Sequence, residues 1–166
     1  DREIYDALML GIEAFNCESL QEIFVINEMA HLHGVKANIS VRINPDIDAH
    51  THKYVTTGLY ENKFGISNHE FDKLIEFIQK SEHINFIGLH FHIGSQITRV
   101  DEVFSLECKR VNEIVKYFES KGLTVRNINL GGGLGVDYDD PDGNPIADFK
   151  AWFNAIDRNI IRRADQ

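Results

Sequence analysis

Apolar residues recur along the chain in two alternating rhythms, one with the spacing of a helix and one in which every second residue is apolar. Segment 39–43 alternates Ile and Val with polar residues, as half-buried strands do. Two capping boxes, Ser19 with Glu22 and Ser67 with Glu70, mark helix starts. The patterns predict strands at residues 12–16, 39–43, 84–95 and 125–130. They predict helices at residues 4–11, 20–33, 67–78, 101–121 and 149–166.

Strict alternation of helices and strands predicts an α/β fold with a parallel sheet built from right-handed crossovers. In the strand at 84–95, a period of two gives the helix-covered face its apolar residues, Ile87, Leu89, Phe91 and Ile93. The opposite face carries Gly88, His90, His92 and Gly94. Two imidazoles and two glycines cannot form a dry helix interface, but they suit the inner face of a barrel near its mouth. The neighbouring strands repeat this polar face with Ser40, Arg42, Asn44, Asn127, Asn129 and Gly131.

These faces favour a parallel (β/α)8 barrel of the TIM type. A complete barrel takes about 250 residues, whereas this chain has 166 residues and four predicted strands that cannot close on themselves. We therefore expect residues 1–166 to form about half of one barrel domain, cut from a longer polypeptide.

Composition narrows the class of function. Lys and Arg number 17 against 26 Asp and Glu, and the net charge of −9 argues against nucleic acid or an anionic membrane as a partner. No stretch reaches the roughly 18 consecutive apolar residues that would cross a bilayer. Cys17 and Cys108 are too few for a disulfide framework, so we expect reduced, buried thiols in a cytoplasmic protein.

Three consecutive glycines, Gly131, Gly132 and Gly133, follow the last predicted strand. Glycines let backbone N–H groups wrap an anion without obstruction by a Cβ atom, which favours a phosphate cradle. The spacing matches neither a dinucleotide fingerprint nor a P-loop, because no Lys-Ser/Thr pair follows. A purely structural turn is the alternative.

His92 lies where a barrel strand gives way to its loop, with Ser95 just beyond it. Its ring could stack on a flat ligand while the Ser95 hydroxyl reaches a phosphate oxygen. We interpret His90 as a hydrogen-bonded core residue. A metal site on the pair His90 and His92, in a metal-dependent hydrolase, is an alternative that lacks an inward-facing carboxylate nearby.

Arg42 carries a fixed positive charge on a barrel-facing position, suited either to an anionic ligand oxygen or to an ion pair at the barrel mouth. The polar segment 46–63 is long enough to be a functional loop, and Lys63 at its end could pair with a carboxylate across a subunit contact or be solvated. Acidic residues of segment 137–142 form a solvated rim that would favour an ammonium-bearing substrate.

Several stretches together resemble the fold-type III pyridoxal-phosphate-dependent decarboxylases, a class that shares the alanine racemase-like barrel. The stretches cover nearly the whole chain in family order: Phe15-Asn16-Cys17-Glu18-Ser19, Val41-Arg42-Ile43-Asn44-Pro45-Asp46, Lys63-Phe64-Gly65-Ile66, His90-Phe91-His92-Ile93-Gly94-Ser95-Gln96 and Leu130-Gly131-Gly132-Gly133-Leu134-Gly135. The resemblance implies pyridoxal 5'-phosphate as cofactor, which acts as an electron sink for the carbanion left by loss of CO₂.

By this resemblance, His92 would stack on the pyridine ring, and Ser95 with the amides of Gly131, Gly132 and Gly133 would hold the cofactor phosphate. Arg42 would approach the phenolic oxygen of the cofactor. The Schiff-base lysine of the family would lie outside this chain, so that the chain contains no catalytic residue and is inactive alone. Lys36 sits in a Lys-Ala-Asn context that imitates this lysine, but it precedes the strand of Arg42 and is rejected.

The resemblance further implies that the whole protein converts meso-2,6-diaminopimelate to L-lysine as a homodimer, a substrate assignment that depends mainly on residues 44–65. Relatives that act on arginine, ornithine or carboxynorspermidine share the same cofactor motifs and stay open as alternatives. So does a non-catalytic homologue that only binds the cofactor.

Overall fold

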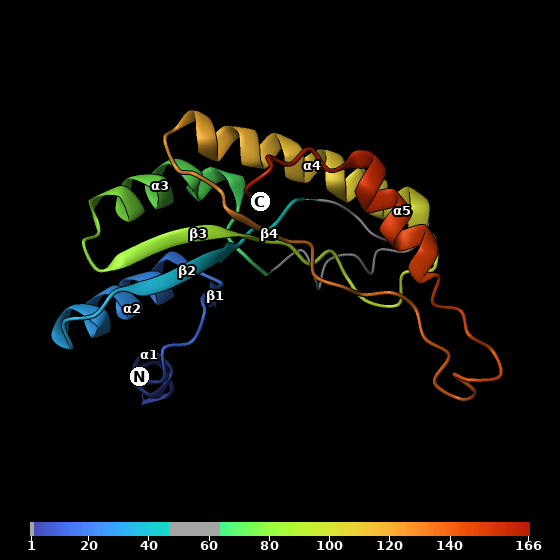
Figure 1. The fold of residues 1–166 in the computed structure, drawn as a ribbon, viewed down its shortest axis with the longest axis horizontal. Coiled ribbons are helices and arrows are strands. Elements are labelled where there is room, and N and C mark those ends of the chain that lie inside the picture. Colours follow the sequence, from blue (N-terminus) through green and yellow to red (C-terminus); the bar gives the residue numbers. More distant parts are fainter. Residues whose placement is uncertain (1, 47–63) are drawn as a thin grey trace.

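The computed structural model describes residues 2–46 and 64–166, and it contains one parallel sheet. Four strands lie in the order of the sequence: β1 (Phe15–Cys17), β2 (Ala37–Arg42), β3 (Ile84–His90) and β4 (Asn127–Asn129). Every neighbouring pair is parallel, and Figure 1 shows the strands fanned side by side through the middle of the molecule. The predicted parallel α/β fold is confirmed.

Helices occupy the connections between the strands. The elements are α1 (Arg2–Leu10), α2 (Leu20–Leu32), the short 3-10 turn η2 (Asn68–Glu70), α3 (Phe71–Lys80), α4 (Val100–Ser120) and α5 (Phe149–Asn159). In Figure 1, α3 and α4 run along one side of the sheet, and α5 lies beside the first half of α4. None of the helices in the described ranges is long and apolar enough to span a membrane.

The main core fills the space between the sheet and helices α2, α3 and α4. Ile39 and Val41 of β2, Leu89 of β3 and Phe91 just after β3 are fully buried there. From α4, Phe118 stacks on Phe86 of β3 with ring centroids 6.1 Å apart. Burial of this apolar face, at roughly 25 cal/mol per Å², is what holds the helices on the outer side of the sheet and leaves the inner side for polar residues.

A register shift in β3 corrects one predicted face. Ile39 pairs with Phe86, but the next residue, Ser40, pairs with Gly88, so β3 has one residue more than β2 at this point. Ile87 therefore lines a polar hollow on the inner side with Ser40 and Asn127, although it was predicted to face the helices. An extra residue of this kind changes which side chains point inward.

Strand ends also differ from the predictions. Strand β3 stops at His90 and not at residue 95, because neither neighbouring strand continues to pair with it. On one side, the N–H of Asn44 bonds the carbonyl of Ile66 instead; on the other, β4 ends at Asn129. Strand β4 is likewise shorter than 125–130, and β1 starts at Phe15 and not at residue 12. His92 and its neighbours consequently lie on a loop and not within the strand.

The two predicted capping boxes behave differently. Ser19 caps α2, its hydroxyl accepting a hydrogen bond from the N–H of Glu22 at 3.2 Å. Ser67 makes no such cap bond, because the 3-10 turn η2 separates it from α3.

This contrast gives a stability prediction. Ser19→Ala should lower the free energy of unfolding by about 1 kcal/mol, since a backbone N–H loses its acceptor. Ser67→Ala is the matched control and should change it by less than about 0.5 kcal/mol. Chemical unfolding of the two variants checks the difference, and equal losses would contradict the assignment of the cap.

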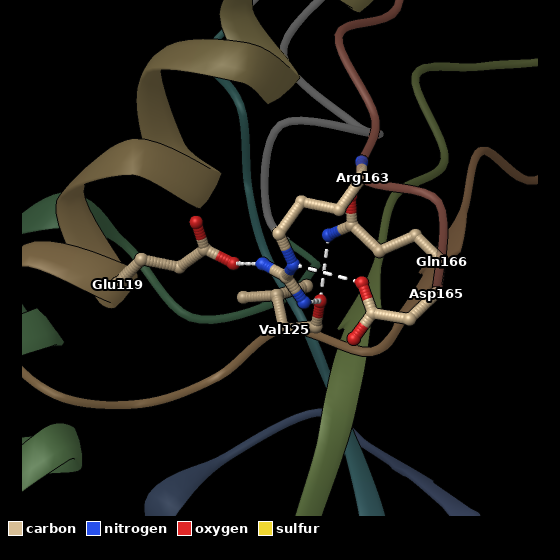
Figure 2. Close-up of polar contacts among 5 residues, drawn as sticks. All are labelled: Glu119, Val125, Arg163, Asp165 and Gln166. Atoms are coloured by element: carbon tan, nitrogen blue, oxygen red, sulfur yellow. Dashed lines mark hydrogen bonds and ion pairs between the residues drawn. The ribbon is translucent and has the colours of Figure 1, made fainter.

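Residues 160–166 leave the helix predicted for 149–166, since α5 ends at Asn159. Arg163 anchors this segment: it pairs with Glu119 of α4, and its Nη2 donates to the carbonyl of Val125 at 3.0 Å (Figure 2). Nε2 of Gln166 donates to the same carbonyl at 2.6 Å. The anchor brings residues 163–166 back to the amino end of β4. In a parallel sheet joined by right-handed crossovers, every strand begins at this end.

Candidate active site

Two loops that follow neighbouring strands run side by side at the carboxyl end of the sheet. Residues 91–97 leave β3 and residues 130–136 leave β4. Backbone hydrogen bonds join them: Phe91 N–H to Asn129 at 2.7 Å, Ile97 N–H to Gly133 at 2.8 Å, and Gly135 N–H to Ile97 at 3.0 Å. His92 and the triple glycine, 39 to 41 residues apart in the sequence, are thereby brought to one place.

Each of the three glycines has a distinct place. A Cβ atom on Gly131 would lie 2.9 Å from Nδ1 of His92 and overlap the carbonyl oxygen of Phe91. A Cβ atom on Gly133 would overlap the carbonyl oxygen of Gly94. Both residues also have positive φ angles, 68° and 104°, which only glycine adopts freely. Gly132 has no atom within 4 Å of its Cβ position, so it faces open space.

The site offers hydrogen-bond donors without partners. Within the described ranges, the N–H groups of Gly132 and Gly133 and the hydroxyl of Ser95 make no hydrogen bond. Successive free N–H groups at a turn with positive φ angles form a concave site for an anion. The interpretation as a phosphate cradle therefore fits the geometry better than a turn that satisfies its own backbone.

Arg42 ends β2 and lies one strand away from this cradle, opposite His90 in the ladder. Its Nη1 pairs with Oε1 of Glu18, which follows β1, and its guanidinium lies 5.3 Å from the ring centre of Phe64. The other carboxylate oxygen of Glu18 accepts the N–H of Gly65 at 3.1 Å. The ion-pair interpretation of Arg42 is thus confirmed, and its Nη2 and Nε donate no hydrogen bond within residues 2–46 and 64–166.

Sequence reasoning missed Glu18 as a site residue. Two signals could have found it: its place immediately after a strand, where barrel side chains reach the mouth, and its position in the stretch Phe15-Asn16-Cys17-Glu18-Ser19 that carries the resemblance.

His90 faces the inner side between Arg42 and His92. Its Nδ1 is buried and has no partner in the described part of the chain, contrary to the predicted hydrogen-bonded core residue. Burial, with Arg42 and His92 nearby, lowers the pKa of His90, so its imidazole is neutral at pH 7. In residues 2–46 and 64–166, no group of three His, Cys, Asp or Glu side chains could hold a metal ion.

A polar layer lies beneath the site. Asn16, Ser40, Asn127 and Asn129 line a hollow of about 280 Å³ from three strands, which confirms the predicted polar inner face. Lys36 immediately precedes β2, at the opposite end from Arg42. Six residues of strand separate the two by about 20 Å, so Lys36 does not reach the cradle, in agreement with its rejection.

A second apolar cluster supports the two loops from below. Ile93 and Ile97 of the first loop pack with Val103 and Phe104 of α4 and with Ala155 of α5. Leu134 of the glycine loop and Trp152 lie against the same cluster. The loops are therefore seated on a packed base, which limits how far they can separate.

In the acidic rim, the carboxylate of Asp137 accepts hydrogen bonds from residues of the same loop. Oδ1 of Asp137 accepts the N–H groups of Asp139 and Asp140 at 2.9 and 3.1 Å, and its Oδ2 accepts an amide proton from Asn144. These bonds lower the pKa of Asp137 and keep it charged. Asp48 and Lys63, both of the polar segment 46–63, lie outside the described residues.

Both cysteines are buried and free, as predicted. Burial raises the pKa of Cys108 to about 12 and that of Cys17 further, so neither thiol ionises near neutral pH.

Comparison with known proteins identifies the family of this chain. The family model for the pyridoxal-binding domain of pyridoxal-dependent decarboxylases matches residues 1–166. The chain belongs to this family. The resemblance proposed from the motifs is confirmed, pyridoxal phosphate is the cofactor of the family, and the metal-site alternative is not supported.

The similar proteins share one name. The chain is 48% identical over 153 residues to diaminopimelate decarboxylase of Bacteroides thetaiotaomicron, covering 92% of this chain and 39% of that protein. It is 40% identical over 148 residues to the enzyme of the same name from Aquifex aeolicus, covering 87% and 34%. This member of the pyridoxal-binding family thus spans well under half the length of the curated relatives it matches.

Solved structures agree on the fold. A diaminopimelate decarboxylase from M. jannaschii in complex with L-lysine superposes with a TM-score of 0.81 at 36% identity, covering 95% of this chain and 36% of that one. The Helicobacter pylori enzyme with L-lysine gives 0.75 at 37% identity, covering 96% and 41%. The partial barrel is therefore the fold of this family's cofactor domain.

Proposed function

We propose that the whole protein decarboxylates meso-2,6-diaminopimelate to L-lysine with pyridoxal phosphate, and that residues 2–46 and 64–166 supply one wall of its cofactor site. The observation that carries the proposal is the close approach of His92 to Gly131, beside the N–H groups of Gly132 and Gly133, which make no hydrogen bond within the described part of the chain. An aromatic phosphate ester needs a flat stacking surface and an anion cradle next to each other. The proposed substrate is that of the similar enzymes, which are diaminopimelate decarboxylases.

Different residues of this chain would bind different parts of the cofactor. The His92 ring would stack on the pyridine face, while the Ser95 hydroxyl and the amides of Gly132 and Gly133 bind the phosphate. The N–H of Gly131, also expected to bind it, donates instead to Oδ1 of Asn129 at 2.8 Å. Arg42, oriented by its pair with Glu18, would donate to the phenolic oxygen. Hydrogen bonds from neutral donors to a charged phosphate are charge-assisted and contribute roughly twice as much as neutral pairs.

When bound, pyridoxal phosphate supplies the electron sink that decarboxylation requires. The chain's own contribution is orientation: stacking at His92 fixes the plane of the ring, and the phosphate cradle fixes its position. The lysine that attaches the cofactor and the acidic partner of its pyridine nitrogen would belong to the whole protein outside this chain. The inactivity of the chain alone, the homodimer and the cytoplasmic location stay predictions.

The decisive experiment mixes the whole protein with pyridoxal phosphate, follows the absorbance of the bound cofactor, and then measures CO₂ release from meso-diaminopimelate. Arginine, ornithine and carboxynorspermidine are tested in parallel. Cofactor binding with CO₂ release only from one of these other substrates would overturn the substrate assignment. Cofactor binding with no release from any substrate would favour the non-catalytic homologue.

His92→Ala tests the stacking role. Loss of the ring should weaken pyridoxal phosphate binding by about tenfold to a hundredfold, since stacking of a heteroaromatic ring on an aromatic side chain contributes roughly 1 to 3 kcal/mol. His92→Phe, which keeps a flat ring, should recover most of the affinity. Titration of each variant with the cofactor checks this, and an unchanged affinity in His92→Ala would contradict the role.

A further inference from the structure

A side chain that has no part in the proposed contacts ties the two loops of the site together. Nε2 of Gln96 donates to the carbonyl of Val136 at 2.9 Å, and Oε1 of Gln96 accepts the N–H of Val136 at 2.7 Å. The carboxamide thus uses its donor and acceptor on both polar groups of a single residue in the opposite loop. We call this pair of bonds the Gln96 clasp.

The clasp continues the backbone bonds between the loops. Ile97 and Gly133 are joined at 2.8 Å and Gly135 and Ile97 at 3.0 Å, and the clasp adds the next connection outward at Val136. Ser95 directly precedes Gln96, and the glycine cradle lies three to five residues before Val136. Fixing Gln96 to Val136 therefore fixes the spacing between the hydroxyl and the N–H groups that face one anion.

The backbone at Gln96 is held in an unfavourable conformation. Its φ angle is 57°, in the left-handed region that residues with long side chains rarely occupy. Strain of this kind persists where surrounding contacts over-determine the conformation. The two bonds to Val136 fix the Gln96 side chain, and together with the backbone bonds of Ile97 they support this conformation.

We propose that Gln96 is a positioning residue for phosphate recognition: its clasp sets the distance between Ser95 and the glycine loop, so that both bind the same phosphate group. This role rests on the proposed function, because it assumes that pyridoxal phosphate occupies the cradle. Gln96 does not touch the ligand; it acts through the loop backbone. Its effect should therefore depend on whether the ligand carries a phosphate.

The test compares pyridoxal 5'-phosphate with pyridoxal, which lacks the phosphate, on the whole protein. Gln96→Ala removes the clasp, and we expect about tenfold weaker binding of the phosphate ester, the effect of losing one or two net hydrogen bonds. Binding of pyridoxal should change less than twofold. Gln96→Glu keeps the acceptor for the Val136 N–H but repels its carbonyl, so its affinity for the phosphate ester should be intermediate.

Two further variants separate the clasp from backbone strain. Gln96→Gly relieves the left-handed strain and deletes the clasp, so it should fold at least as well as Gln96→Ala and still bind the phosphate ester about tenfold more weakly. Gln79→Ala is the matched control, because Nε2 of Gln79 also donates to a backbone carbonyl, that of Lys121, at 2.7 Å but away from the site. It should change neither affinity.

Amide hydrogen exchange at Val136 without cofactor gives a readout that does not need binding. Faster exchange in Gln96→Ala, but not in Gln79→Ala, supports the clasp. Equal losses of affinity for pyridoxal and its phosphate would overturn a role in phosphate recognition, as would an unchanged affinity in Gln96→Ala. If the unmodified protein bound no pyridoxal phosphate, the proposed function itself would fail, and this role with it.

Discussion

Gly133→Ala is expected to abolish pyridoxal phosphate binding and to lower the free energy of unfolding of the whole protein by about 3 kcal/mol. Two effects add at this residue. The new Cβ would overlap the carbonyl oxygen of Gly94, a backbone atom that no rotamer change can move away, and the φ angle of 104° is closed to alanine. Cofactor titration and chemical unfolding together measure the result.

Gly132→Ala is the matched control from the same loop. Its Cβ would meet no atom within 4 Å, so the variant should fold with a change of less than about 0.5 kcal/mol. It should still weaken cofactor binding, because the methyl group would occupy the open side of the cradle. Equal destabilisation by the two substitutions would show that the loop is not held against Gly94 as described.

Glu107→Met is expected to stabilise the protein on the order of 3 kcal/mol at pH 7 and to flatten its pH dependence. Glu107 lies fully buried on α4, and neither carboxylate oxygen has a hydrogen-bond partner within the described residues. Burial raises its pKa from 4.5 to about 8. The folded state therefore keeps a proton that the unfolded chain releases, so stability falls as the pH rises from about 4.5 to 8.

Urea unfolding between pH 5 and pH 9 measures this slope. Glu107→Gln should remove the slope but gain less stability than Met, because its amide stays buried without partners. Glu113→Gln is the control: this carboxylate of the same helix is exposed and pairs with Arg110, so its replacement should change stability by less than about 1 kcal/mol. A pH slope that persists in Glu107→Met would assign the effect to another group.

The convergence of His92 with the glycine loop could be predicted because it follows from topology. Parallel strands place their carboxyl ends at one edge, so residues after β3 and after β4 must meet there. The strand pattern was sufficient for that step, and for the polar inner layer that includes Ser40 and Asn127. Both depend only on periodicity and connection order.

Particular contacts between loops could not be predicted. The partner of Arg42 is Glu18, 24 residues earlier and after a different strand, and no sequence pattern pairs them. The left-handed backbone of Gln96 is equally hidden, because propensity assigns such angles to glycine or asparagine. These features depend on loop geometry, which the packing of several elements decides together.

The extra residue in β3 decides which side chains face the site. Before the shift, even-numbered positions such as Phe86 point outward; after it, odd-numbered positions such as Leu89 and Phe91 do. Parity is thus inverted halfway along one strand. Without that inversion, His90 and His92 would project into the apolar layer under α4, and neither imidazole would face the inner side of the sheet.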